Sequence, residues 1–324
     1  MGLLIDGQWH NQPQEARSTK GRFVRRDAQF RNWITPDGSP GPSGEGGFEA
    51  EPGRFHLYVS YACPWAHRTL IFRVLKGLEE MISISVVHWH MGESGWTFNE
   101  AEIPDSVNHA DYAYQIYTAC DSGYTGHVTV PVLWDKERST IVSNESSEII
   151  RMFNKAFNGV GAKQSDYYPE ALRGEIDQIN ERVYHTLNNG VYRAGFSTTQ
   201  GAYEEAVVPL FETLDWLEER LGEQRFLIGN TITEADWRLL TTLLRFDPVY
   251  AHHFKCNLRR IADYPNLSSY MRDLYQQPGV AGTFRLDHVK LHYYRSHASV
   301  NPTQIVPLGP QVDYSTPHDR NRFG

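Results

Sequence analysis

The stretch that decides the fold reads SYACPWAHR and occupies residues 60–68. It follows residues 54–59, in which apolar and polar side chains alternate in the manner of a strand. Pro64 then stands where a helix would begin, a position at which proline is well tolerated. Cys63 is therefore predicted to lie at a strand–helix junction, directly before the first turn of the helix.

The position of Cys63 at a helix start favours ionisation of its thiol. The backbone N–H groups of a helix start carry partial positive charge, and a cysteine thiol held there can have a pKa of about 3.5–7.5. His67 and Arg68 follow about one turn later and add positive charge where they face the site. Ala66 occupies the place of the second cysteine of a dithiol motif, so an external thiol must resolve any disulfide that Cys63 forms. The motif alone leaves a buried, inert cysteine as the alternative.

Helix and strand signals continue after this junction. Apolar residues recur at helical spacing from Leu70 to Leu78. Further elements are expected as strands at 82–87, 128–134 and 140–143 and as a helix at 145–157, with a polar, aromatic insertion at 91–126. We therefore predict an α/β domain over residues 49–160, preceded by an extension over residues 1–48 that ends in a Gly-, Pro- and Ser-rich segment.

Strand signals fade after residue 160. Apolar residues recur every three or four positions from Tyr203 to Leu221, which predicts an amphipathic helix. Thr233 followed by Asp236 is a capping pattern that starts another helix, and one more is expected at 267–275. Residues 161–324 are therefore predicted to form an all-helical domain with an irregular tail.

Composition excludes several classes of protein. The net charge of −8 argues against a general affinity for nucleic acid, and no apolar stretch approaches the ~20 residues of a membrane span. The N-terminus lacks the features of a signal peptide, so cytoplasm is expected. The three cysteines contain no CxxC pair, and His88 and His90 on one strand face would lack further ligands, so neither a disulfide nor a metal is expected.

Two further motifs leave alternatives open. Pro131 lies inside an apparent strand, where it requires either an edge position or a cis peptide bond that would turn the Val130 backbone toward a ligand. Residues 143–148 open a helix, and their amides and hydroxyls suit a carboxylate ligand. Simple N-capping accounts for the same residues.

The order of these motifs resembles the glutathione-transferase fold, with a thioredoxin-like first half and an all-α second half. Longer pieces make the chain similar, over nearly its whole length, to the glutathionyl-hydroquinone reductases, also called xi-class glutathione transferases. The pieces that carry the resemblance include Cys63–Arg68, Gly95–Phe98, Thr129–Asp135, Ser143–Ser146, Arg245–Tyr250 and His292–His297.

The resemblance implies a reaction in which glutathione, as cosubstrate, reduces a glutathionyl-hydroquinone to free hydroquinone and glutathione disulfide. Cys63 matches the family nucleophile and would form a mixed disulfide with glutathione. Tyr192 and Tyr293 match tyrosines placed near the quinol, where phenols supply hydrogen bonds or protons. The resemblance also implies a homodimer.

The resemblance further implies how glutathione is held. It places Trp96 over the tripeptide, Val130 and Pro131 at its cysteinyl part, and Glu145 and Ser146 at its γ-glutamyl end. His127 stands before the Val-Pro pair, where relatives are expected to carry arginine or lysine. Because histidine is only partly charged near neutral pH, it is a weaker partner for a carboxylate.

Three other functions compete with this one. An omega-type thioltransferase or dehydroascorbate reductase would use Cys63 in the same way and differ only in the second substrate. A non-catalytic assembly module on the same fold would leave Cys63 unreactive. A serine-type conjugating transferase fits less well, because a cysteine in this place forms a disulfide with glutathione rather than activating it.

Overall fold

A computed structural model describes residues 2–11 and 20–324 of the chain. The described residues separate into two compact units. The first unit holds residues 2–11, 26–165 and 283–292, and the second holds residues 20–25, 166–282 and 293–324.

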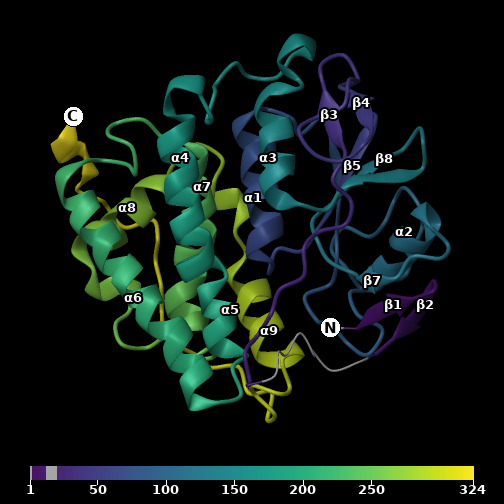
Figure 1. Cartoon of the computed structure of the whole chain (residues 1–324). Helices are drawn as coiled ribbons and strands as arrows, with labels where there is room; N and C mark the ends of the chain where they lie inside the picture. The colour runs from purple at the N-terminus through teal and green to yellow at the C-terminus, as the bar shows by residue number, and fades with distance from the viewer. Residues whose placement is uncertain (1, 12–19) are drawn as a thin grey trace. The chain divides into compact units, whose positions relative to one another are not determined.

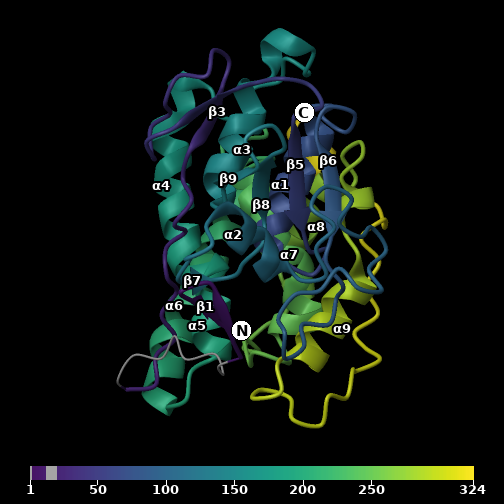
Figure 2. The same ribbon diagram turned by 90° about the vertical axis from the view of Figure 1, so that its right-hand side faces the viewer.

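A four-stranded mixed sheet forms the centre of the first unit. Its strands stand in the order β6-β5-β8-β9, as Figure 2 shows, and run over Ser83–Val86, Phe55–Val59, Val132–Asp135 and Thr140–Ser143. β5 is parallel to β6 and antiparallel to β8, and β8 is antiparallel to β9. Every residue of β5 is buried, as expected of a central strand covered on both faces. The predicted α/β first half is confirmed.

Two expected strands, at 82–87 and 128–134, differ in extent from the structure. β8 begins at Val132 rather than at Val128, directly after Pro131, which has no N–H group to donate to a ladder. The Val130–Pro131 peptide bond is cis, one of the two alternatives that the sequence left open. β6 ends at Val86, so His88 and His90 do not lie on a strand face as expected.

Three α-helices lie wholly within the described part of this unit. α1 (Pro64–Leu75) has proline at its first position, as the sequence predicts, and packs against α3 (Ser146–Lys155). α2 (Ala113–Cys120) lies in the insertion, where no element was expected. Its buried residues are only Ala113, Ile116 and Tyr117, so its apolar pattern is too short to be distinctive.

Short strands from the first fifty residues join this unit. β1 (Leu3–Ile5) pairs with β2 (Gln8–His10) and with β7 (Gly126–His127) in a three-stranded sheet. β3 (Trp33–Thr35) runs parallel to β4 (Gly47–Glu49).

Every element that lies wholly within the second unit, as far as the structure describes it, is helical, in agreement with the sequence. The long helices that lie wholly within this unit, labelled in Figure 1, are α4 (Arg173–Val183), α6 (Gln200–Glu223), α7 (Glu234–Arg245) and α8 (Pro265–Tyr275). α7 packs against α4 and α8, and α6 packs against α8 and the short α5 (Gly190–Gly195). A π-helical turn, η4 (Phe246–Tyr250), continues α7. The division between the units falls within α9 (Leu286–Ser296), after His292.

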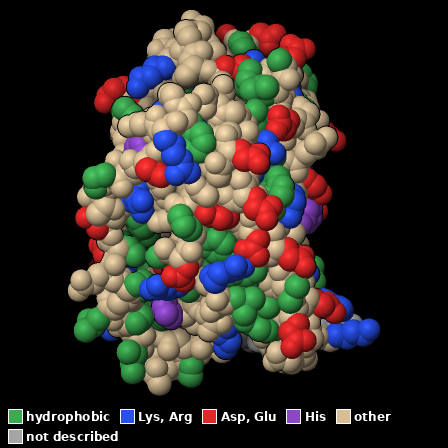
Figure 3. Space-filling view, turned by 90° about the vertical axis from the view of Figure 1, so that its left-hand side faces the viewer, with side chains coloured by type: hydrophobic (Ala, Val, Ile, Leu, Met, Phe, Trp, Pro, Cys, Tyr) green, Lys and Arg blue, Asp and Glu red, His purple; other side chains and the backbone are tan. Residues whose placement is uncertain are grey.

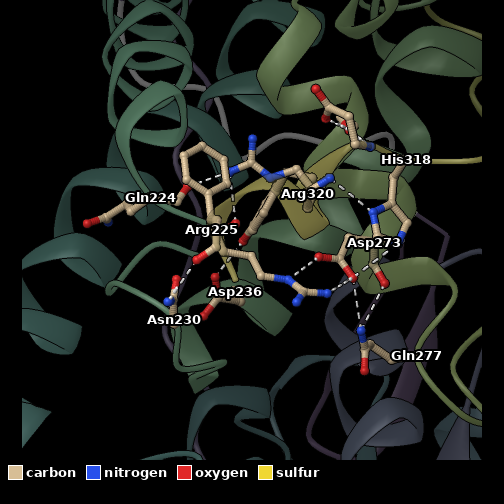
Figure 4. A network of polar contacts seen from close by, with 12 residues as sticks. Gln224, Arg225, Asn230, Asp236, Asp273, Gln277, His318 and Arg320 are labelled. Carbon is tan, nitrogen blue, oxygen red and sulfur yellow. Dashed lines mark hydrogen bonds and ion pairs between the residues drawn. The ribbon is translucent and has the colours of Figure 1, made fainter.

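The start of α7 is fixed by a buried carboxylate. Asp236 and Thr233 form the predicted capping box. Asp236 accepts hydrogen bonds from the backbone N–H of Thr233 and Leu227, at 2.7 and 2.9 Å, and from the hydroxyl of Tyr270 at 2.8 Å. Figure 4 shows it beside a second network, in which Asp273 pairs with Arg225. These contacts hold α7, α8 and the loop after α6 together.

The surface carries both signs of charge. On the face with α6 and α8, Figure 3 shows basic and acidic side chains interspersed, so that this face offers no single-sign basic field for a nucleic-acid backbone. Within residues 2–11 and 20–324, no helix combines the length and the apolar character needed to cross a membrane.

The buried side chain of His56 makes the free energy of unfolding depend on pH. Its ring nitrogens lie 2.7 and 2.9 Å from the hydroxyls of Ser83 and Ser85, and burial lowers its pKa from 6.5 to about 4. The unfolded chain takes up this proton below about pH 6.5, whereas the folded chain does so only near its lowered pKa. The stabilisation is therefore fully present above pH 6.5 and is lost as pH falls, by of order 1–2 kcal/mol at pH 5.

Urea unfolding at pH 7 and pH 5 measures this loss. A His56→Gln variant, which keeps an uncharged hydrogen-bonding side chain, should lose less stability between the two pH values than the wild type. Exposed His252→Gln serves as the control and should behave as the wild type does. Equal pH dependence in all three proteins would contradict the assignment.

Candidate active site

Cys63 caps the N-terminus of α1. Its backbone is extended, with φ −76° and ψ 122°, and its carbonyl accepts from the N–H of His67 at 3.0 Å to close the first turn. The thiol is half-buried and donates to the carbonyl oxygen of Val130 at 3.5 Å. Because the first-turn amides carry partial positive charge, this position favours the thiolate, which is the reactive form of cysteine.

The two basic residues that follow Cys63 have different partners. The ring of His67 is fully buried, and its Nε2 lies 2.8 Å from the hydroxyl of Thr283. Arg68 is also buried and donates from Nη1 to the hydroxyl of Ser146 at 3.4 Å. Arg68 therefore places its charge at the start of α3, and it joins the helix of the candidate nucleophile to a second predicted binding segment.

A buried tyrosine that the sequence did not single out links the other binding segments. The hydroxyl of Tyr117 donates to the carbonyl of Thr129 at 2.8 Å and accepts from the N–H of Thr129 and from Nδ2 of Asn144, each at 3.2 Å. One donor and two acceptor positions are thus all used. Burial raises the pKa of Tyr117, so the phenol stays neutral. This hydroxyl fixes Val130 relative to the start of α3.

Glu145 and Ser146 lie at that helix start, where the sequence placed them. Glu145 is the N-cap residue, and its Oε1 accepts from the N–H and the hydroxyl of Ser147 at 2.9 and 2.8 Å. The capping role left open by the sequence is therefore present. A carboxylate, a hydroxyl and helix-start amides together suit an amino-acid head group, which carries one ammonium and one carboxylate.

Trp96 is held by neighbours in the same unit. Only 6% of its surface is exposed, and its carbonyl accepts from the N–H of Ala113, the first residue of α2, at 2.9 Å. Its indole stacks on the ring of His292 with centroids 4.7 Å apart. Because α2 also carries Tyr117, one helix supports both Trp96 and the segment that leads to Val130.

His127 directly precedes the segment of Val128 to Val130. Its ring hydrogen-bonds to the backbone of Gly2, and burial lowers its pKa. Its Nδ1 is buried and has no hydrogen-bond partner within the described part of the chain. A neutral ring that is already engaged with Gly2 is poorly suited to neutralise a carboxylate.

Tyr192 and Tyr293 form a separate cluster in the second unit. Their hydroxyl oxygens lie 2.5 Å apart, although 101 positions separate them in sequence. The guanidinium of Arg25 lies over the ring of Tyr192, 4.8 Å from its centroid. Burial raises the pKa of Tyr293 well above its ordinary value, so this residue is a neutral hydrogen-bond donor.

Tyr250 is a third member that the sequence analysis did not propose. It lies in the π-helical turn η4, is fully buried, and brings its hydroxyl to 3.1 Å from that of Tyr293. The matching piece Arg245–Tyr250 contained it, but no spacing rule brings residues from two distant helices together. Interruptions of this kind in a helix often accompany functional sites.

The two remaining cysteines have different surroundings. Cys256 is fully buried, and burial raises the pKa of its thiol far above the ordinary value. The thiol of Cys120 lies 3.2 Å from the hydroxyl of Thr140. In the described ranges, 2–11 and 20–324, no group of three or more histidine, cysteine or acidic side chains is arranged to hold a metal ion.

Comparison with known families gives two matches along the chain. The model described as "Glutathione S-transferase, N-terminal domain" matches residues 62–156. The model described as "Glutathione S-transferase, C-terminal domain" matches residues 200–273.

Relatives match over nearly the whole length. The glutathionyl-hydroquinone reductase YqjG of Escherichia coli is 57% identical over 100% of both chains. The glutathionyl-hydroquinone reductase PcpF of Sphingobium chlorophenolicum is 59% identical over 96% of both chains. The glutathione-bound structure of YqjG superposes with a TM-score of 0.91 over 99% of both chains, at 55% identity. The Xi glutathione S-transferase of Phanerochaete chrysosporium gives a TM-score of 0.87 at 52% identity, covering 93% of this chain and 96% of that one.

Proposed function

The chain belongs to the glutathionyl-hydroquinone reductases of the glutathione S-transferase family, and from this premise we propose that it uses glutathione to reduce glutathionyl-hydroquinones to free hydroquinones. The observation that carries the proposal is the thiol of Cys63 at the N-terminus of α1, 3.5 Å from the Val130 carbonyl. A single thiol in this place, without a second cysteine in the same turn, requires a thiol substrate to complete each cycle.

The first step forms a mixed disulfide. The thiolate of Cys63 attacks the sulfur of the glutathionyl group, and a sulfur–sulfur bond forms as the bond between that sulfur and the ring carbon breaks. The electron pair passes to the ring carbon, which takes up one proton. The two sulfurs are oxidised to the disulfide level, the ring carbon is reduced, and hydroquinone leaves.

The second step restores the enzyme. The thiolate of a glutathione molecule attacks the glutathionyl sulfur of the mixed disulfide, so that glutathione disulfide forms and Cys63 leaves as a thiolate. The proton lost by this glutathione balances the proton gained by the ring carbon. The sum is one glutathionyl-hydroquinone and one glutathione converted to hydroquinone and glutathione disulfide.

We assign the glutathione contacts to residues of the first unit. The backbone of Val130 and Pro131 would hold the cysteinyl part, and Glu145 and Ser146 would take the ammonium and the carboxylate of the γ-glutamyl end. This division follows from their charges, because Arg68 and the α3 amides favour an anion beside Ser146. Trp96 would cover the tripeptide.

His127 has a lesser role in this proposal. Its ring is engaged with Gly2, so it supports the backbone ahead of Val128 rather than a charged group.

The tyrosine cluster supplies neutral donors for the quinol. Tyr192 and Tyr293 would hydrogen-bond to the hydroxyl groups of the hydroquinone and assist proton delivery as the ring carbon loses sulfur. Their mutual bond of 2.5 Å lets one phenol polarise the other. Tyr250 extends this cluster by a third hydroxyl.

A turnover assay tests the proposal. The wild-type protein is incubated with a glutathionyl-hydroquinone and excess glutathione, and the products are measured by chromatography. We expect hydroquinone to be released together with one equivalent of glutathione disulfide. Failure to release hydroquinone, together with reduction of dehydroascorbate or of a small mixed disulfide, would instead establish the omega-type thioltransferase.

Alkylation separates both enzymes from a non-catalytic module. Iodoacetamide near neutral pH should label Cys63 faster than a small thiol, while buried Cys256 in the folded protein stays unlabelled. Slow labelling of Cys63 together with no turnover would support the assembly module.

The proposed reaction depends on glutathione, which favours a reducing compartment, and we therefore propose that the protein acts in the cytoplasm. The homodimer stays a prediction.

Tyr293→Phe should lower kcat/KM for the glutathionyl-hydroquinone about 100-fold and leave kcat/KM for glutathione, which reports only the second step, unchanged. The substitution keeps the buried ring but removes the hydroxyl that lies between Tyr192 and Tyr250, and general acid assistance is worth at least this factor. Steady-state kinetics of hydroquinone release measure the effect. Tyr294→Phe is the matched control, because that buried hydroxyl donates only to the Pro248 carbonyl at 3.2 Å. Equal kcat/KM values for the glutathionyl-hydroquinone in the two variants would remove Tyr293 from the proposed chemistry.

A further inference from the structure

We propose that the N-terminal hairpin, β1 with β2, is a positioning element of the glutathione site and that Trp9 is its main residue. The inference rests on the proposed function, because it takes Trp96 and Val130 as contacts of glutathione. It concerns residues 2–11, which the family models do not cover.

The hairpin is built locally but stabilised by distant partners. Asp6 and Gly7 have φ values of 48° and 75°, which is the geometry of a tight two-residue hairpin turn. A two-stranded hairpin of three-residue strands is marginal by itself. Its further contacts therefore decide whether it forms.

The first set of contacts reaches the segment before Val130. Leu3 and Leu4 pair with His127 and Gly126 of β7. The N–H of Gly7 donates to the carbonyl of Tyr124 at 3.1 Å, and the side chain of Leu4 is fully buried. Figure 1 shows β1 between β2 and β7. The hairpin thus pairs with the strand that ends three residues before Val130.

The second set reaches the turn before Trp96 through one side chain. The indole Nε1 of Trp9 donates to the carbonyl of Glu93 at 2.9 Å. Its ring stacks on Tyr114 of α2, with centroids 5.3 Å apart and planes inclined by 20°. It also lies against Gly95, where an added Cβ would come within 2.7 Å of the ring.

Gly95 makes this contact specific. Its φ of +76° is a conformation that side chains disfavour, and its N–H closes the turn onto the carbonyl of Gly92 at 3.0 Å. Trp96 follows at once. A rigid ring packed on Gly95 therefore restrains the backbone from which the Trp96 indole projects.

The hairpin consequently ties together two segments that the proposed function assigns to glutathione. Neither segment contains Cys63, so loosening the hairpin should weaken glutathione binding without removing the nucleophile. Because the hairpin restrains Trp96 and Val130, its formation and glutathione binding favour each other. Glutathione that orders Trp96 and Val130 therefore also stabilises the hairpin.

Trp9→Ala in the full chain tests the inference. We expect the Kd of the resting enzyme for glutathione, measured by calorimetry, and the KM for the glutathionyl-hydroquinone, whose glutathionyl part takes the same site, to rise about tenfold, from loss of one hydrogen bond and one aromatic contact. The kcat at saturating glutathione should stay within about twofold of the wild type, since an interaction shared by ground and transition states affects KM alone. Trp9→Phe, which keeps a ring on Tyr114 and Gly95, should recover part of the affinity.

Trp216→Ala is the matched control. Trp216 is a half-buried indole on α6 of the second unit, under the guanidinium of Arg182. It should leave the Kd for glutathione unchanged. Far-UV circular dichroism of each variant reports whether the chain is folded. If Trp9→Ala does not fold, the Kd of Trp9→Phe for glutathione tests the inference instead.

Two results would overturn the inference: a wild-type Kd for glutathione in Trp9→Ala, or a fall in kcat with Kd unchanged. The calorimetric measurement needs no quinol. A failure of the hairpin proposal is therefore distinguishable from a failure of the proposed reaction, which would appear as absent hydroquinone release by the wild type.

Discussion

Cys63→Ser should lower kcat/KM for hydroquinone release by at least about 1,000-fold. A serine hydroxyl is not ionised near neutral pH and cannot form the mixed disulfide, so no step of the proposed cycle remains. The substitution is close to isosteric, and the helix-start geometry of α1 does not depend on the sulfur, since Cys63 makes no side-chain capping bond. Steady-state release of hydroquinone at fixed glutathione measures the change.

Cys120→Ser is the control for this experiment. Its thiol is also half-buried and contacts the Thr140 hydroxyl at 3.2 Å, and no step of the proposed cycle uses it. It should retain the activity of the wild type. Residual turnover by Cys63→Ser within tenfold of the wild type would show that another group carries the chemistry.

Asp236→Ala should produce the largest loss of stability, about 3–5 kcal/mol in the free energy of unfolding. The change removes the cap of α7 and leaves the N–H groups of Leu227 and Thr233 and the hydroxyl of Tyr270 buried without their acceptor. Loss of a cap costs about 1 kcal/mol, and each buried unsatisfied donor about 1–3 kcal/mol, with partial relaxation lowering the sum. Urea unfolding followed by circular dichroism measures the loss.

Asp263→Ala provides the comparison, because Asp263 is also the third residue of a capping box but is exposed to solvent. Water can replace its hydrogen bonds, so its removal should have a much smaller effect. If Asp236→Ala and Asp263→Ala unfold at the same urea concentration, burial of the carboxylate is not what stabilises this region.

The junction at Cys63 could be predicted because its signals are local. Alternation over residues 54–59 and a proline at the first helical position are enough to define β5 and α1. The capping box of α7 is likewise contained within four residues. In both places the residues that determine the structure lie within a few consecutive positions of the sequence.

The parts that escaped prediction depend on distant partners. β1 is paired with β7, more than 120 positions later, although the turn residues Asp6 and Gly7 are themselves a hairpin signal. Tyr117 serves the site through its hydroxyl, and nothing in its neighbourhood along the chain distinguishes it from a core aromatic residue.

The tyrosine cluster shows the same limit. The resemblance named Tyr192 and Tyr293, but only the packing of η4 beside α9 shows that Tyr250 joins them. Periodicity identifies which face of a helix is buried, not which buried hydroxyls meet.

A single-turnover experiment tests the central claim, attack by Cys63 on the glutathionyl sulfur, most directly. Protein in excess is mixed with a glutathionyl-hydroquinone in the absence of glutathione, and released hydroquinone and intact protein mass are followed together. The account predicts one hydroquinone released for each protein molecule that gains one glutathionyl group, located on Cys63 by peptide mapping and removed by added glutathione. Hydroquinone released without this adduct, or an adduct on another cysteine, would contradict it.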